Sequence, residues 1–423
     1  MHPPPLPPDK RRELFNLCLN NVSCMETYLQ GWFMGAKMHD IQRDNVREFL
    51  LWAFFDTQDD DLDAGDSRVE HELDEYIAVV EKRLGRPLKP GRGPAKSLRL
   101  TLDSVHATYR GLTWYAVIFL VDQLTHLAMS WYGFQYHARA PSEVLKMFPP
   151  RPQELLCRQR SPTPGLGYWH YPHTDSSKRP VVFFHGIGVG LWTYVRFLRE
   201  ICTSHADGGS VGVIAVELLP VSFRLTNPLP DKASFITQMS KILKHHGWGS
   251  YSITSHSFGS VLTTHMIHST EAGSRAASAV LIDPVTISLH LPSVAYNFTR
   301  RSPKRANEWQ LWYFASTDPA VALSLGRHFF WRENIMWEDE LRGGPSAGEG
   351  CDVGREWKAA VCLSGMDLIV DTEAVAQYLA DVGGVQVILF PQLDHAQVFD
   401  DVSCRQRVVQ LVRAQCDTAL EST

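Results

Sequence analysis

The chain has 423 residues, of which 44% are hydrophobic and 21% are charged, and its formal net charge is −5. This composition excludes a disordered chain, and the acidic balance excludes the basic surface of a nucleic-acid-binding protein. The 8 cysteines are scattered without a C-x-x-C pair or a zinc-type spacing, and residues 1–8 are proline-rich rather than arranged as a signal peptide. We therefore expect a reduced, cytoplasmic protein.

Residues 1–150 are predicted to form an N-terminal helical region. Apolar side chains recur at helical spacing in residues 43–55 and again in residues 70–83. The acidic stretch 59–63 between them predicts a solvated loop. The pattern assigns no role to this region.

Residues 112–134 form the most apolar segment of the chain. Their length alone would allow a membrane span. However, Asp122 and Gln123 lie at the centre, where an ionised aspartate costs about 2.5–3.5 kcal/mol on insertion scales. We expect a helix that is buried in the protein or lies on a membrane surface, rather than one that spans it.

Strand-like and helix-like runs alternate over residues 175–283 and 357–420. The strand-like runs are 180–184, 210–218, 251–255, 276–282, 357–363 and 385–390, and the helix-like runs are 231–245, 261–267 and 404–414. This alternation predicts an α/β protein with a mostly parallel sheet flanked by helices. Residues 284–356 interrupt the alternation and are rich in tryptophan and phenylalanine.

A candidate nucleophile, Ser257, lies at the centre of the pentapeptide Ser-His-Ser-Phe-Gly between a predicted strand and a predicted helix. This is the context of a nucleophile elbow, in which small residues two before and two after the serine let strand and helix approach closely. The usual pattern is Gly-x-Ser-x-Gly, and here Ser255 replaces the first glycine. The alternative is an ordinary strand-to-helix loop.

A glycine-rich loop, His-Gly-Ile-Gly-Val-Gly at residues 185–190, follows an earlier predicted strand. Its glycines allow backbone N–H groups to face a developing oxyanion. The expected donors are the N–H of Phe258, directly after the nucleophile, and the N–H of Ile187. The alternative is a dinucleotide loop, although the third glycine comes one residue early for Gly-x-Gly-x-x-Gly.

The candidate base is His395, in the loop after the strand-like run 385–390, because such folds place their catalysts at the carboxyl ends of strands. Asp367 follows the preceding strand and is the favoured acid to orient the imidazole and stabilise its charged form. Asp283, one strand earlier, is the alternative acid; otherwise it caps the turn at Pro284.

The chain order Ser257, Asp367, His395, with the glycine loop upstream, resembles the α/β-hydrolase superfamily of the serine-nucleophile type over about residues 175–415. The resemblance implies an α/β-hydrolase fold with residues 284–356 as an inserted cap and residues 1–150 as a helical extension. It also implies acyl transfer, in which Ser257 attacks a carbonyl, His395 takes its proton and water clears the acyl-enzyme. No metal or organic cofactor is needed.

The aromatic cap favours an apolar pocket roof, although these side chains could also serve only to pack the cap against the sheet. Together with segment 112–134, they favour a small-molecule or lipid ester as substrate and contact with a membrane surface. Two alternatives are open: a catalytically inactive hydrolase-like binding or scaffold protein, and an acyltransferase that passes the acyl group to an alcohol.

The histidine pair His245 and His246 is a different kind of candidate. Two adjacent histidines look like a metal pair, but neighbours on a helix are expected to point in different directions. We therefore expect no metal site there.

Overall fold

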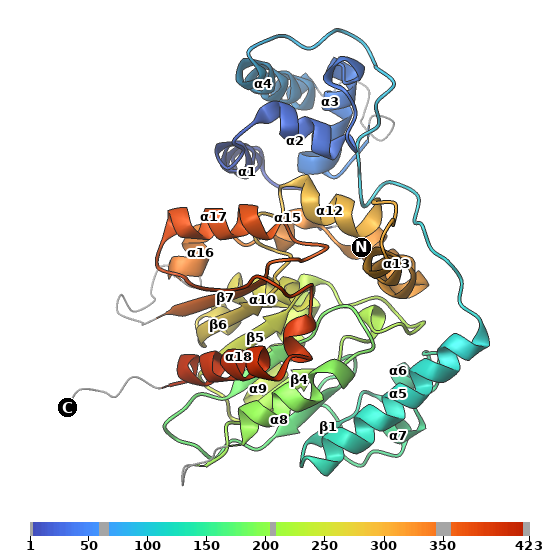
Figure 1. Cartoon of the computed structure of the whole chain (residues 1–423), viewed down its shortest axis with the longest axis vertical. Helices are drawn as coiled ribbons and strands as arrows, with labels where there is room; N and C mark the ends of the chain where they lie inside the picture. Colours follow the sequence, from blue (N-terminus) through green and yellow to red (C-terminus); the bar gives the residue numbers. More distant parts are fainter. Residues whose placement is uncertain (1–2, 59–66, 204–208, 344–356, 418–423) are drawn as a thin grey trace, which may run out of the picture.

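The computed structural model describes residues 3–58, 67–203, 209–343 and 357–417, and its centre is an eight-stranded sheet (Figure 1). The strand order is β1-β2-β4-β3-β5-β6-β7-β8. Strand β2 is antiparallel to both of its neighbours, and all remaining pairs are parallel. The strands are β1 (Gln135–His137), β2 (Tyr168–Tyr171), β3 (Val181–Phe184), β4 (Val213–Val216), β5 (Tyr251–His256), β6 (Ala276–Ile282), β7 (Lys358–Ser364) and β8 (Gln386–Phe390).

Helices cover both faces of the sheet because the central strands are apolar on both sides. In β3, Val181 and Phe183 join one core cluster, whereas Val182 and Phe184 join the other. This is the two-residue alternation of a strand with both faces buried. The first cluster contains α8 (Val195–Cys202) and α18 (Val402–Gln415), and the second contains α9 (Lys232–His245), α10 (Gly259–Ile267), α11 (Thr270–Gly273) and α17 (Thr372–Val382).

This strand order, with its antiparallel second strand and its helices on both faces, is that of the α/β-hydrolase fold, which confirms the predicted fold class. The predicted strand 276–282 coincides with β6, and the other predicted strands differ from the observed ones only at their ends. Seven cysteines within the described ranges are unpaired thiols, and Cys351 lies outside those ranges.

The structure differs from the predicted domain boundary at residue 150. Strand β1 belongs to the sheet, and α5 (Leu112–Trp131) packs against β1 and α8. Both fall in the predicted N-terminal region because α5 is helical and because β1 is a short run of aromatic and polar residues without clear alternation. The part of the chain that stands apart from the sheet is therefore shorter than predicted and ends before α5.

The N-terminal extension packs onto the insertion rather than onto the sheet (Figure 1). The indole of Trp32 donates to the carbonyl of His290 over 3.2 Å, and that of Trp331 donates to the carbonyl of Ala53 over 3.0 Å. The predicted acidic loop 59–63 lies outside the described residues. The helices of the extension are α1 (Pro8–Asn20), α2 (Met25–Trp32), α3 (Arg43–Leu50), which continues as a π-helical turn (Leu51–Phe55), and α4 (Ser67–Leu84).

The insertion is the segment between β6 and β7, and it is described up to residue 343. Its helices are α12 (Pro292–Thr299), α13 (Ala306–Leu311), α14 (Pro319–His328), α15 (Trp331–Asn334) and α16 (Glu338–Gly343), with a π-helical turn at Trp312–Ser316. Two short helices, α6 (Pro141–Val144) and α7 (Pro152–Leu155), follow β1. Single 3₁₀ turns are found at Met38–Asp40, Trp192–Tyr194, Leu219–Val221 and Gln397–Phe399.

The polar centre of α5 faces the protein. Asp122 is buried and pairs with the guanidinium groups of Arg151 and Arg224, each over 2.8 Å. Arg151 also pairs with Glu217 and Glu154, so a buried cluster of charges ties α5 to the sheet. Within the described residues, α5 is the one helix long and apolar enough to cross a membrane. Crossing would break these buried pairs, and removing one partner of such a pair is strongly destabilising.

Candidate active site

Ser257 stands at a sharp turn between β5 and α10. Its φ angle is +50°, in the left-handed region that side chains other than glycine rarely adopt. Such strain is held only where the surroundings impose it, and it often marks a functional site. The tight turn also requires Gly259, because a Cβ there would lie 2.3 Å from the carbonyl oxygen of Phe184 in the neighbouring strand.

The structure explains why Ser255 can replace the usual glycine of the pentapeptide. Its side chain is fully buried, and its hydroxyl accepts a hydrogen bond from the hydroxyl of Thr263 on α10 over 2.8 Å. The extra polar group is therefore satisfied where strand and helix meet. Thr263 has no counterpart in the motif, so sequence reasoning could not identify it as the partner.

The three residues predicted to act together form one hydrogen-bonded chain with His395 in the middle. Nε2 of His395 is 2.8 Å from Oγ of Ser257, and Nδ1 of His395 is 2.6 Å from Oδ2 of Asp367. A carboxylate can only accept, so it selects the tautomer with hydrogen on Nδ1. Nε2 is then left to accept the proton of the Ser257 hydroxyl.

The backbone of its own loop fixes the orientation of the Asp367 carboxylate. Its Oδ1 accepts from the N–H groups of Ile369 and Val370 over 2.7 and 2.9 Å. Only 1% of its side chain is exposed. The free rotation of the carboxyl group is thereby removed, and Oδ2 faces the imidazole.

Asp283, the alternative acid, makes no hydrogen bond to His395 within the described parts of the chain. Its carboxylate accepts from the N–H and hydroxyl of Ser364 over 2.8 and 3.0 Å, and from the N–H of Ala396 over 3.1 Å. Asp283 therefore connects the end of β7 to the loop that carries His395 through these hydrogen bonds. Burial raises the pKa of Asp283 to about 6.

The carboxylates around His395 dominate its electrostatics. Burial alone would lower the pKa of the imidazole, but Asp367, and behind it Asp283 and Asp394, raise the pKa of His395 to about 9. The positive charge that the histidine acquires when it takes a proton is therefore well stabilised.

A tyrosine that the sequence analysis missed joins the glycine loop to the elbow. The hydroxyl of Tyr194 accepts from the N–H of Gly186 over 3.2 Å and lies 2.7 Å from Nδ1 of His256. Burial lowers the pKa of His256 well below its usual value, so its ring is neutral. Nothing in the local sequence around residue 194 signals this contact.

The glycine loop approaches the nucleophile closely. A Cβ at Gly186 would lie 2.8 Å from Nδ1 of His256 and 2.9 Å from Cβ of Ser257, so only glycine fits there. The N–H groups of Phe258 and Ile187, the two expected donors, make no hydrogen bond to any residue that the structure describes. Ile187 and Phe258 both line the pocket that contains Ser257.

An apolar pocket opens beside Ser257, and all three parts of the chain build it. The extension contributes Leu100, and the core contributes Ile187, Phe258 and Ile369. The insertion contributes the remaining apolar wall, which consists of Val285, Leu289, Val294, Ala295, Phe298, Leu325 and Phe329. Several of the large aromatics that marked the insertion in the sequence, such as Trp309, are instead exposed.

No family model matches the sequence, and no curated protein does. Among solved structures, the chain is similar to a bacterial membrane phospholipase A, with 13% identity and a TM-score of 0.42 over 72% of this chain and 94% of that one. The chain is also similar to carboxylesterase CesB of Bacillus subtilis, with 11% identity and a TM-score of 0.42 over 71% of this chain and 99% of that one. For a thermophilic esterase of Thermogutta terrifontis, the identity is 14% and the TM-score is 0.42 over 60% of this chain and 94% of that one. Likenesses this weak carry no argument about the reaction, which has to be made from the side chains.

Proposed function

We propose that the protein is a serine hydrolase that cleaves carboxylic esters through an acyl-enzyme on Ser257. The observation that carries this proposal is the continuous hydrogen-bonded chain from Ser257 through His395 to Asp367, with contacts of 2.8 and 2.6 Å. A serine, a base within reach of its proton and an acid that orients the base form the arrangement that nucleophilic acyl transfer requires.

In the proposed reaction, Oγ of Ser257 attacks the ester carbonyl while Nε2 of His395 takes its proton. The tetrahedral oxyanion accepts hydrogen bonds from the N–H groups of Phe258 and Ile187, and Asp367 stabilises the imidazolium. The intermediate collapses, His395 returns the proton to the leaving alcohol, and water repeats the sequence to release the acid. The base contributes about 10²–10⁴-fold and each oxyanion donor about 10²–10³-fold.

The pocket lining supports an acyl chain as the part of the substrate that enters. Its walls are aliphatic and phenyl side chains, and among the lining residues only Ser257 and Thr299 carry a polar side-chain group. We therefore propose a lipid or other long-chain acyl ester, because an apolar chain gains from burial and a polar acyl group would lose its hydration.

The acyl preference is tested with p-nitrophenyl esters of increasing chain length. We expect kcat/KM to rise from acetate to octanoate, and we expect Ala295→Phe, which fills the pocket wall, to reduce octanoate hydrolysis much more than acetate hydrolysis. A sharp preference for acetate in the parent protein would contradict the proposed substrate class.

The nucleophile is tested with a fluorophosphonate probe on the folded protein. We expect labelling, with loss of the label in Ser257→Ala. Ser255→Gly is the matched control, because it restores the usual pentapeptide two residues away and should keep the label. Well-folded protein that does not label would favour the inactive scaffold.

Hydrolysis and acyl transfer share the same acyl-enzyme, so labelling does not separate them. Product analysis in the presence of a long-chain alcohol does. We expect the free acid to predominate, whereas an ester of the added alcohol as the main product would assign the protein to the acyltransferases.

Helix α5 supports the proposal that the enzyme works at a lipid surface. One face of this helix binds the sheet through Asp122, while the opposite face exposes Leu120, Leu124 and Leu127, with Trp131 86% exposed at its end. An exposed apolar row that ends in tryptophan is typical of a helix lying in the membrane interface. The proposed lipid substrate makes lipid, rather than another protein, the expected partner of this face.

Vesicle flotation tests the lipid contact. We expect the protein to float with phosphatidylcholine vesicles and Leu120→Gln with Leu127→Gln to abolish flotation. Val402→Gln is the control, because Val402 is 54% exposed on a different helix. Equal flotation of all variants would contradict the proposal that α5 contacts lipid. A dimer in solution that the double variant converts to monomer would also contradict it.

A further inference from the structure

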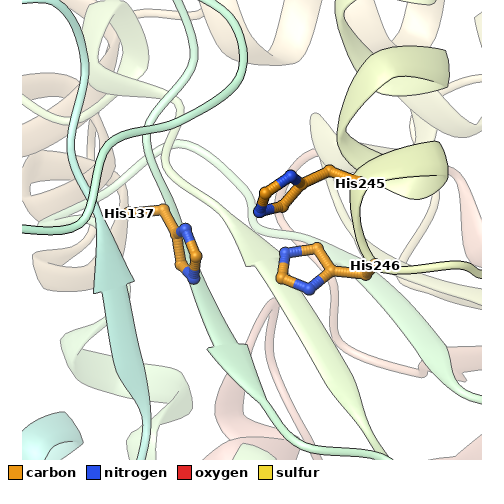
Figure 2. A group of neighbouring side chains, drawn as sticks. All are labelled: His137, His245 and His246. Atoms are coloured by element: carbon orange, nitrogen blue, oxygen red, sulfur yellow. The ribbon is translucent and has the colours of Figure 1, made fainter.

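Three histidines from distant parts of the chain converge outside the pocket and outside the hydrogen-bonded chain of Ser257. His137 lies on β1, His245 is the last residue of α9, and His246 follows it (Figure 2). Their rings point toward one another, and each offers a nitrogen that lies within 4.8 Å of the other two. The three residues are defined here as the histidine cluster.

His245 and His246 were expected to point apart as adjacent residues at a helix end, and the structure corrects this expectation. The expectation holds inside a helix, but α9 ends at His245, and His246 is its C-cap with φ −91° and ψ 1°. The change in backbone direction brings the ring centroids to 5.0 Å, with the ring planes at 85°. Adjacent histidines at this helix end can therefore serve one ligand.

His137 is the member that points most clearly to a missing ligand. It is only 7% exposed, and both of its ring nitrogens are buried without a well-formed hydrogen bond among the described residues, although the backbone of Arg160 lies close to the ring. Buried polar side-chain atoms nearly always have a partner, so an unpartnered imidazole calls for an explanation. Its ring is held in place by stacking on Tyr168, with centroids 4.6 Å apart and planes at 8°.

The surroundings of the cluster are aromatic and contain a fourth imidazole. His170, on β2, stacks on His246 with centroids 3.9 Å apart, and its buried Nδ1 has no hydrogen-bond partner among the residues that the structure describes. The hydroxyl of Tyr168 lies 2.9 Å from Nε2 of His246. Nitrogen ligands of this kind suit zinc, copper and nickel, whereas magnesium and calcium require oxygen.

We propose that His137, His245 and His246 bind one divalent transition-metal ion, for which Zn²⁺ is the representative. Zn–N bonds of about 2.0–2.1 Å in a tetrahedron place neighbouring nitrogens about 3.3–3.4 Å apart. The exposed side chain of His245 can rotate to close the remaining distance. Water takes the fourth position.

The bound ion would join α9 to the short edge strand β1 and would take no part in the ester chemistry. Strand β1 has three residues and pairs only with β2, so a cross-link from its last residue to the core would hold the edge of the sheet. An ion that binds the folded chain alone raises its stability by mass action.

The test is a calorimetric titration of the full-length protein with ZnCl₂, after treatment with EDTA, its removal, and blocking of the thiols with N-ethylmaleimide. We expect one ion per chain and a higher midpoint of thermal unfolding. His137→Phe keeps the stacking on Tyr168 and should lower the affinity by more than the roughly 10–100-fold that loss of an outer-shell partner costs. His71→Ala, an exposed histidine on α4, is the control and should bind as the parent does.

His245→Ala decides the question if His137→Phe does not fold, because the side chain of His245 is exposed. Zinc binding that is absent from the parent, or that persists unchanged in both variants, overturns the proposal. Ester hydrolysis by the two variants should equal that of the parent, so failure of the metal site and failure of the proposed esterase are separate results.

Discussion

Replacing Asp367 by asparagine is the sharpest test of how the site works, because the structure dictates the orientation of the new amide. The backbone N–H groups of Ile369 and Val370 donate to Oδ1 over 2.7 and 2.9 Å. Two donors need an oxygen, so the amide oxygen must stay there. The amide NH₂ of Asp367→Asn is then forced toward Nδ1 of His395.

The consequence is that the imidazole of His395 adopts the opposite tautomer. An amide NH₂ can only donate, so Nδ1 must become the acceptor and the ring proton moves to Nε2. Nε2 then donates to Ser257 instead of accepting its proton, and the base is lost. The analogous change in serine proteases lowers kcat by about 10⁴, which corresponds to about 5 kcal/mol of barrier at 1.36 kcal/mol per tenfold. The fold should persist, because both backbone hydrogen bonds survive.

The assay is steady-state hydrolysis of p-nitrophenyl octanoate, with the midpoint of thermal unfolding measured on the same samples. Asp283→Asn is the matched control, because that carboxylate makes no hydrogen bond to His395 within the described chain; we expect its kcat within about tenfold of the parent. A folded Asp367→Asn protein that keeps a tenth of the parent kcat, or an Asp283→Asn protein that loses more than Asp367→Asn does, would refute the reasoning.

Three further predictions concern pH, the glycine loop and stability. Because His395 must be unprotonated to act as base and its pKa is raised to about 9, kcat/KM should rise with pH and level off above about 9. Asp283→Asn removes a nearby negative charge, so it should shift the rising part of this pH profile to lower pH. A rising part that does not shift counts against the charge effect. Gly186→Ala would place a Cβ 2.9 Å from that of the nucleophile, so it should abolish hydrolysis and lower the free energy of unfolding by about 1–3 kcal/mol in urea titrations; normal rates would show that the loop can move aside. Arg151→Met leaves buried Glu217 without its arginine partner and should lower the free energy of unfolding by about 3–5 kcal/mol in urea titrations, whereas a loss below 1 kcal/mol would mean that the cluster adds little.

The sequence by itself determined the features that depend on neighbouring residues. The strand-like run 276–282 coincides with β6 because a continuous apolar run bounded by turns has few alternatives to a buried strand. The pentapeptide around Ser257 predicted a tight turn because only small residues let a strand and a helix approach that closely, and the observed φ of +50° shows that turn. His395 could be proposed from chain order alone.

Only the tertiary structure decided which of these residues meet. Asp367 and Asp283 follow adjacent strands and look equivalent in sequence. In the structure, however, the carboxylate of Asp367 contacts His395, whereas that of Asp283 accepts from the N–H of Ser364. Tyr194 and His137 carry no local signal, since their partners lie far away along the chain. Periodicity and turn chemistry act over a few residues, whereas the meeting of distant side chains depends on strand register and on how helices end.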